Sequence, residues 1–285
     1  MRRALLAALL LASCSQTPAP TPQPRYYLGE PYRAGGLWSY PREEFGLDES
    51  GIAAILPPRA GLTANGEAAD PQGMLAAHRT LQLPAIVTVT NLDNGRSLRL
   101  RVHDRGPDMA GRIIGVSRRA ATLLGASGPF RARIVLDGQA SRGAIDGLAG
   151  QSVLPIQTAP VGRVDRESLA PPPGARGGTG PAATPSRAAA ESARVAREPE
   201  RLPEQVMQGY ANPGRIWLEA GQFFRRDLAQ AQAARIGGQA EPFGPGGRQQ
   251  QWRVRAGPYG SIAEADAALA RALAGGQPDL RLAVE

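Results

Sequence analysis

The middle of the chain alternates apolar and polar positions with a period of two residues, which indicates β-strands. Residues 85–91 (AIVTVTN) and 97–103 (SLRLRVH) are two such segments, and in the second the apolar and the basic side chains fall on opposite faces. Asn94 and Gly95 lie between them, a pair that favours the primed turns of hairpins. The pattern predicts an antiparallel hairpin with Asp104 at the end of its second strand.

Further short elements follow this hairpin. Strands are expected at residues 112–116 and 131–136, with a small helix between them. The helix is expected to begin at Ser117 and to stop at Gly125, because serine is a common N-cap and glycine a common C-terminal stop. Several short strands with one small helix predict a compact, mainly β barrel.

The C-terminal part of the chain contains an internal repeat. Residues 217–223 (WLEAGQF) and 253–259 (RVRAGPY) each predict a strand that ends in glycine, one further residue and an aromatic ring. Each is followed by a predicted helix, at 227–236 and at 261–274, and apolar residues recur at helical spacing in the second. The repeat predicts a small α+β domain with two pseudo-equivalent halves.

The N-terminus is typical of an exported lipoprotein. Residues 1–13 (MRRALLAALLLAS) combine two arginines with an apolar run that is too short to span a bilayer as a helix, as in a secretory signal. The run ends in LASC, which resembles a bacterial lipobox, so Cys14 is expected to carry acyl chains such as palmitate; several chains are needed for stable anchoring. Ser15 follows rather than aspartate, which by resemblance favours the outer membrane. The alternative is an ordinary signal peptide with an incidental cysteine.

Composition predicts how the chain divides. Residues 14–25 are rich in proline, threonine and glutamine, as in a tether. The barrel is assigned to residues 26–138 and the α+β domain to residues 214–285. Residues 139–213 are rich in alanine, proline, glycine and arginine, which predicts a disordered linker.

Charge and cysteine content exclude some classes of function. The formal net charge is +8, yet arginine is spread over the whole chain, linker included, and the N-terminus indicates export. Nucleic-acid binding is therefore not expected. Cys14 is the only cysteine, so no intramolecular disulfide is possible. With two histidines and no ligand cluster at metal spacing, no metal or cofactor is expected.

Several motifs together resemble the rare lipoprotein A family over about residues 26–137. They are TANGE (63–67), AAHRTL (76–81), VTNLDNGRS (89–97), HDRGP (103–107) and GRIIGVS (111–117), preceded by the lead-in YLGEPYRAGGLWSYPREEFGLDESGIA (27–53). The C-terminal repeat resembles a SPOR domain. The resemblance implies a double-psi β-barrel and a ferredoxin- or RNP-like SPOR domain, which binds peptidoglycan glycan strands that lack stem peptides.

The family's activity is endolytic lytic transglycosylation of peptidoglycan, in cell wall remodelling and daughter-cell separation. In this reaction the 6-hydroxyl of N-acetylmuramic acid attacks its own anomeric carbon and a 1,6-anhydro ring forms. One carboxyl group can act as both acid and base, unlike the two carboxylates of glycoside hydrolases. The expected partners are peptidoglycan, the membrane through Cys14, and septal division proteins.

The resemblance places the active site at Glu67, His78 and Asp104. Asp104 is expected to be the acid/base, Glu67 to orient or polarise, and His78 to hydrogen-bond within the cluster. Each also has a structural alternative. Asp104 could pair with Arg105 or cap backbone amides, Glu67 could be a solvated turn residue, and His78 could be a structural hydrogen-bonding group.

Four departures from the family pattern keep a second function open. Residues 53–57 (AAILP) replace Ala-Ser-Trp-Tyr-Gly, so the aromatic pair expected to line a sugar groove is absent. Residues 59–61 replace a His-Gly pair, His103 replaces asparagine, and Gly115 replaces aspartate. Weaker or altered glycan binding is expected. The alternative function is a catalytically inactive, peptidoglycan-binding septal lipoprotein.

The repeated strands of the SPOR-like domain are expected to bind glycan. The candidate residues are Gln222, Phe223, Arg253, Arg255 and Tyr259. For Phe223 and Tyr259 the alternative is that their rings belong to the core.

Overall fold

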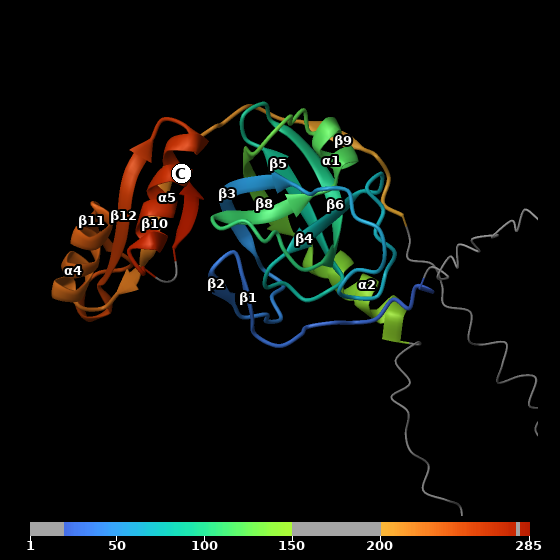
Figure 1. Ribbon diagram of the computed structural model, residues 1–285, viewed down its shortest axis with the longest axis horizontal. Coiled ribbons are helices and arrows are strands. Elements are labelled where there is room, and N and C mark those ends of the chain that lie inside the picture. The colour runs from blue at the N-terminus through green and yellow to red at the C-terminus, as the bar shows by residue number, and fades with distance from the viewer. Residues whose placement is uncertain (1–19, 150–200, 278–279) are drawn as a thin grey trace, which may run out of the picture.

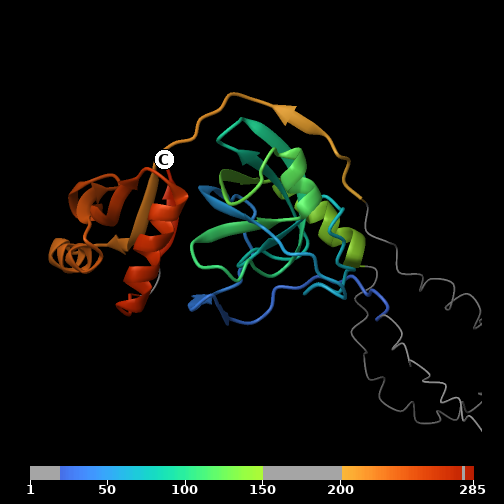
Figure 2. The same ribbon diagram turned by 45° about the horizontal axis from the view of Figure 1, so that its top comes forward.

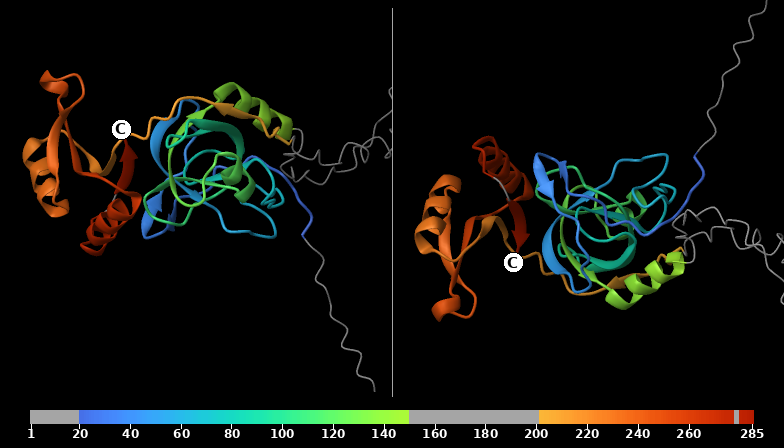
Figure 3. Two further views of the ribbon diagram at one scale, coloured as in Figure 1. Left: turned by 90° about the horizontal axis from the view of Figure 1, so that it is seen from above. Right: turned by 90° about the horizontal axis from the view of Figure 1, so that it is seen from below.

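The computed structural model describes residues 20–149, 201–277 and 280–285 (Figure 1). The predicted signal segment 1–13, Cys14 and the centre of the predicted linker lie outside these residues. The described chain forms two folded parts that lie side by side in all views (Figures 1 and 3). No described helix is long and apolar enough to cross a membrane.

The first part is a closed β-barrel. Six strands pair in the order β3-β7-β4-β6-β5-β8, and the pairing of β8 with β3 closes the ring. The β3–β7 and β4–β6 pairs are parallel and the other four are antiparallel. The strands are β3 (Asp48–Ile55), β4 (Leu75–His78), β5 (Ala85–Asn91), β6 (Arg96–Asp104), β7 (Arg112–Val116) and β8 (Phe130–Leu136).

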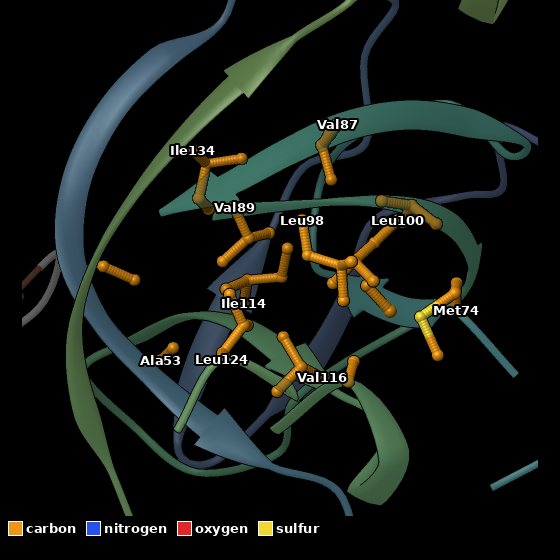
Figure 4. Packing of buried hydrophobic residues seen from close by; sticks show 14 of the residues in the cluster. Ala53, Met74, Val87, Val89, Leu98, Leu100, Ile114, Val116, Leu124 and Ile134 are labelled. Carbon is orange, nitrogen blue, oxygen red and sulfur yellow. The ribbon is translucent and has the colours of Figure 1, made fainter. Parts of the chain in front are cut away.

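Apolar side chains fill the barrel (Figure 4). Leu98, Leu100 and Val102 are fully buried in this core, as the alternation along residues 97–103 predicts. The predicted strands at 85–91 and 112–116 coincide with β5 and β7. The side chain of Ser117 caps α1 (Arg118–Leu123) by accepting a hydrogen bond from the amide of Ala120. The mainly β barrel is therefore confirmed.

Residues 138–149 form helix α2 (Gly138–Ala149) and not the start of a linker. The Ser141 hydroxyl is buried, accepts a hydrogen bond from the Ile86 amide of β5 (2.9 Å) and donates one to the Asp137 carbonyl (2.7 Å). The Asp137 carboxylate accepts a hydrogen bond from the Ala140 amide and so stabilises the first turn. The prediction of a linker from residue 139 was wrong here, because the alanines and glycines belong to a packed helix.

The far end of the predicted linker is also ordered against the barrel. Strand β9 (Val206–Gln208) pairs antiparallel with β6, and the Asn212 amide donates a hydrogen bond to the Leu92 carbonyl. This segment passes over the barrel before it enters the C-terminal part (Figure 2). Residues 201–213 therefore behave as a strap across the barrel.

The C-terminal part is the predicted small α+β domain. Its sheet has the order β11-β12-β10-β13, and the two repeat segments lie next to each other in β10 and β12. The helices contribute to one core together with Leu218, Val254 and Leu282. The elements are β10 (Ile216–Phe223), α4 (Arg226–Ile236), β11 (Gln239–Phe243), the 3₁₀ turn η1 (Gly247–Gln249), β12 (Gln251–Tyr259), α5 (Ile262–Ala274) and β13 (Arg281–Val284).

The two parts are joined by a packed interface. Strand β13 pairs with β3 at Ala283 and Gly51, so the barrel and the C-terminal sheet are continuous. Ile52 of β3 is fully buried within the core cluster of the C-terminal domain. The guanidinium of Arg112 donates two hydrogen bonds of 2.7 Å to the carboxylate of Asp266 on α5. The described structure therefore holds the two domains in one arrangement.

Candidate active site

A cavity of about 370 Å³ opens where β3 and β6 end and α1 begins. This volume lies in the range of pockets that bind small ligands or parts of larger ones. Asp104 and His103 of β6 lie on its wall, with Asp70 and Arg118 at other points of the lining. Apolar contacts come mainly from Ile55, Leu56, Pro57, Pro71, Leu75 and Met109.

The Asp104 carboxylate is held rigidly at the end of β6. Oδ1 accepts hydrogen bonds from the backbone amides of Ala64 and Arg105, both 2.9 Å long. Oδ2 accepts a 2.6 Å hydrogen bond from Arg59, whose side chain is 55% exposed. The Asp104 side chain itself is 13% exposed.

Glu67 lies behind the pocket wall and not on it. The TANGE turn folds its carboxylate inward, where Arg101 donates to it at 2.6–3.1 Å and Asn65 donates at 2.7 Å. Glu67 is buried, so it is not the solvated turn residue that the sequence left open. Arg101 and Asn65 fix its position, and it does not line the cavity.

His103 is a site residue that sequence reasoning noted only as a departure from the family pattern. Its buried ring lines the cavity, and Nδ1 lies 3.8 Å from Oε2 of Glu67 without a hydrogen-bond partner in the described structure. Burial lowers the pKa of His103 below its usual value, and the charges of Glu67 and Asp104 oppose this shift only in part. The imidazole therefore lies in the field of both carboxylates.

The signal for this cluster was present in the sequence. Arg101 and His103 share the polar face of their strand, and the TANGE turn covers that face with Glu67. Alternation showed which face was polar. It could not show that a distant turn would bury it.

His78 lies apart from this cluster. Its Nδ1 accepts hydrogen bonds from the amides of Thr80 (3.2 Å) and Leu81 (3.1 Å), and its Nε2 lies 3.4 Å from Glu49. The described structure contains no hydrogen bond from His78 to Glu67 or Asp104. The ring instead closes the turn after β4, in agreement with its structural alternative.

Two of the departures from the family pattern meet in the structure. A side chain at Gly115 would place its Cβ 2.4 Å from Cδ2 of Leu56. Leu56 therefore occupies the space into which an aspartate at position 115 would project. Asp104 is left without a second carboxylate from β7.

The arginines among the glycan-binding candidates lie on the face of the C-terminal sheet away from the helices. Arg253 pairs with Glu285 and lies 3.6 Å from Glu219, while Arg255 pairs with Glu285 at 2.8 Å and lies over the Trp217 ring. These contacts make a mixed-charge surface in which each guanidinium is held in place.

The other three candidates lie at the ends of the repeated strands. Gln222 is exposed, whereas Phe223 and Tyr259 are partly buried and pack against the domain core. The rings thus have the core contacts that the alternative anticipated, and each residue remains partly exposed.

The described residues hold no group of three or more histidine, cysteine, aspartate or glutamate side chains suited to a metal ion.

Comparison with known proteins identifies both domains. A family model described as lytic transglycolase matches residues 48–142, and a SPOR domain model matches residues 212–279. The first match includes Glu67, His78, His103 and Asp104.

Similar proteins carry one name. A Pseudomonas aeruginosa (strain PAO1) protein named endolytic peptidoglycan transglycosylase RlpA is 36% identical over 220 residues, which cover 71% of this chain and 60% of the relative. A protein of the same name from Escherichia coli K12 is 40% identical over 104 residues, which cover 36% of this chain and 29% of the relative. Another from Vibrio cholerae is 43% identical over 107 residues, which cover 34% of this chain and 41% of the relative. The chain thus spans 60% or less of the length of these relatives. It belongs to the rare lipoprotein A (RlpA) family, in which a double-psi β-barrel is followed by a SPOR domain.

Proposed function

We propose that the chain is an endolytic lytic transglycosylase that cleaves peptidoglycan glycan strands between N-acetylmuramic acid and N-acetylglucosamine. The observation that carries the proposal is Asp104, a carboxylate fixed at a strand end on the wall of an open cavity. Only one reacting carboxyl group is required, because the nucleophile is the substrate's own 6-hydroxyl.

Asp104 serves as both acid and base in this reaction. Its protonated carboxyl gives a proton to the glycosidic oxygen as the bond to the anomeric carbon breaks. The same carboxylate then takes the proton from the 6-hydroxyl as the new bond to the anomeric carbon forms. No water is consumed. General acid–base assistance of this kind contributes about 10²–10⁴-fold to a rate.

Glu67 and His103 support Asp104 without touching the bond that breaks. Arg101 and Asn65 lock Glu67, and Glu67 in turn faces Nδ1 of His103 at 3.8 Å. The imidazole thus keeps a defined orientation beside Asp104. We assign Glu67 and His103 as positioning residues, and His78 as a positioning residue for the turn after β4.

Strands without stem peptides are the preferred substrate. Removal of the peptide leaves a lactyl carboxylate on N-acetylmuramic acid. Arg118 is exposed at the cavity and Arg59 is half-exposed beside Asp104, so both can meet that negative charge. The SPOR domain, with Gln222, Phe223, Arg253, Arg255 and Tyr259 as binding residues, holds the chain on the same material.

The cell envelope is the site of action that fits this substrate. The LASC tetrapeptide supports lipid attachment at Cys14 and an outer-membrane position facing the periplasm. Cleavage of septal peptidoglycan there would serve wall remodelling and daughter-cell separation, with division proteins as partners. Mass spectrometry of the mature N-terminus tests the anchor. Acylated Cys14 is expected, and a free N-terminus at another residue would contradict it.

The second candidate function is a glycan-binding lipoprotein without catalysis. It is favoured by Leu56, which fills the space beside Gly115 and leaves β7 without a carboxylate next to Asp104. The two functions predict different chemistry from the same protein.

Digestion of sacculi separates the two candidates. Purified sacculi are first treated with an amidase to remove stem peptides and are then incubated with the protein. The transglycosylase yields soluble fragments of many lengths with 1,6-anhydro ends, each lighter by one water than a hydrolysed end. Binding to the sacculi without release of anhydro fragments would identify the barrel as a binding module.

A further inference from the structure

Two aromatic rings stand on the outer face of the β1–β2 hairpin. In β1 (Tyr32–Ala34) and β2 (Leu37–Ser39) the inward positions are packed, and Ser39 is buried. Trp38 and Tyr40 point the other way and are 58% and 59% exposed. Their ring centroids lie 6.5 Å apart with an angle of 28° between the planes. They form one continuous aromatic surface.

This exposure is unusual for the barrel domain. Among described residues 20–149, the exposed large apolar side chains are Trp38, Tyr40, Met109 and Val135. Three of these four lie on the hairpin or on the loop after β6 that the hairpin contacts. Exposed apolar side chains gathered in one region indicate a contact surface for a ligand.

The hairpin is fixed to the rim of the active-site cavity. Arg79 donates hydrogen bonds to the carbonyls of Ala34 (3.3 Å), Pro107 (3.0 Å) and Met109 (3.0 Å). Pro107 and Met109 line the cavity. Gly35, at the hairpin tip, packs so closely on the Asp108 carbonyl that a Cβ would lie 2.0 Å from it. The aromatic pair therefore has a set position relative to Asp104.

The cavity itself has no phenyl, phenol or indole ring in its lining. Pyranose rings carry an apolar face of C–H groups, which packs on aromatic rings, and a rim of hydroxyls that remains in water. Within the cavity a sugar finds Ile55 and Leu56 in place of such a platform. The flat rings belong instead to the hairpin, whose tip packs against the loop of Pro107 and Met109 that lines the cavity.

We propose that Trp38 and Tyr40 form a subsite that binds a sugar ring of the same glycan strand beyond the cavity. That the sugar belongs to peptidoglycan rests on the proposed function. The stacking of a sugar ring on Trp38 and Tyr40 is independent of that function. A strand long enough to reach from Asp104 to the hairpin gains this contact, whereas a short fragment does not.

Binding is read from Trp38 itself, without any need for cleavage. The three tryptophans are Trp38, Trp217 and Trp252, so the full chain with W217F and W252F reports from Trp38 alone. The same chain carries D104N, which prevents turnover. Amidase-stripped glycan strands, fractionated by length, are the probe. A saturable change in Trp38 emission is expected with long strands and is absent with disaccharides.

Substitution then measures the contribution of the subsite. Y40A in this reporter chain is expected to raise the dissociation constant for long strands about tenfold, the effect typical of losing an aromatic contact at a binding surface. V135A removes another exposed apolar side chain of the barrel and is expected to leave binding unchanged. In the active chain, W38A is expected to raise KM for long strands with little change in kcat, and W38F to restore most of the affinity.

Unchanged Trp38 emission at saturating strands would overturn the subsite, since strands held by the SPOR domain alone do not contact the hairpin. An equal loss of affinity in Y40A and V135A would also overturn it. If emission changes and Y40A weakens binding while the wild-type chain yields no anhydro fragments, the subsite stands and the transglycosylase assignment fails.

Discussion

At the residue scale, the site joins an accessible carboxylate to a buried charged cluster. Asp104 faces the cavity, while Glu67 and Arg101 form a buried ion pair behind it. His103 lies between the two, inside the protein and at the wall of the cavity. A buried and incompletely hydrogen-bonded imidazole carries a measurable cost, which makes its position open to a test by pH.

His103 should make folding stability fall in mild acid. In the unfolded chain imidazole binds a proton near pH 6.5, whereas burial holds the pKa of His103 below that value in the folded protein. Between these two pKa values the unfolded state binds more protons, so the free energy of unfolding decreases as pH falls below about 6.5. Replacing His103 by asparagine should remove this part of the decrease.

Urea denaturation of wild type and H103N between pH 5 and pH 7.5 measures the difference. The charged groups that act on the ring, Glu67, Asp104, Arg101 and Arg59, are the same in both proteins. The free energy of unfolding of wild type should decrease more than that of H103N as pH falls. Parallel curves would mean that the imidazole is not held in its neutral form by the fold.

At the element scale, the sequence predicted the regular strands and missed those without alternation. Strands β5, β6 and β7 and helix α1 follow from period-two patterns, a hairpin turn and a serine cap. Strand β3 was missed because residues 51–55 are a run of small and apolar residues, buried along most of its length. A run that is buried on both faces carries no alternation. The parallel β3–β7 and β4–β6 pairs also could not be predicted, because the local sequence pattern does not show which distant strands pair.

Helix α2 shows the limit of composition as a guide. Its alanines and glycines resemble the linker that follows, yet a single serine ties it to β5. Replacing Ser141 by alanine leaves the buried Ile86 amide without its acceptor, which should cost about 1–3 kcal/mol of stability.

Chemical denaturation of S141A compares it with S127A, a substitution of an exposed serine in the turn after α1. S127A should change the free energy of unfolding by less than about 0.5 kcal/mol. Equal free energies of unfolding of the two variants would mean that residues 138–149 are part of the linker and not a helix packed on the barrel.

The candidate site was only partly predictable for a similar reason. The resemblance selected Glu67, His78 and Asp104. In the structure His78 has different contacts from the other two and lies apart from them. A motif gives the residues and their order, but the conformation of the turn after β4 determines the orientation of the His78 imidazole. His103 and the aromatic hairpin required the fold, because their importance lies in what distant segments bring beside them.

At the scale of the whole molecule, the barrel and the SPOR domain share a sheet and an ion pair. Arg112 is 6% exposed and Asp266 is 37% exposed, so loss of the carboxylate leaves a buried guanidinium without its partner. Replacing Asp266 by alanine should reduce the free energy of unfolding by about 1–3 kcal/mol. If the domains moved freely on a long tether, the same change would have almost no effect.

Asp48 provides the control for that substitution. It forms a similar two-point contact with Arg133, but both side chains are about half exposed. D48A should cost less than about 1 kcal/mol. Denaturant titration of D266A and D48A measures both, and an equal, small effect of the two would contradict a docked SPOR domain.

The docked arrangement changes how glycan would reach the barrel. The SPOR sheet, the cavity and the β1–β2 hairpin are parts of one body, so a strand held by one is presented to the others at a set distance. Such positioning raises the effective concentration of substrate at Asp104. Anchoring at Cys14 would add reach toward the wall and leave this internal geometry unchanged.

In the proposed reaction, Asp104 performs the acid/base chemistry of transglycosylation. The most direct test compares D104N with D70N, because Asp70 is another carboxylate on the same cavity wall. Anhydro-muramyl ends released from amidase-stripped sacculi are counted by mass spectrometry, with sacculus binding measured in parallel. D104N should bind like wild type and release at least about 10²-fold fewer anhydro ends, while D70N retains activity within a few-fold of wild type. Release of anhydro ends by D104N at the wild-type rate would show that Asp104 is not the acid/base.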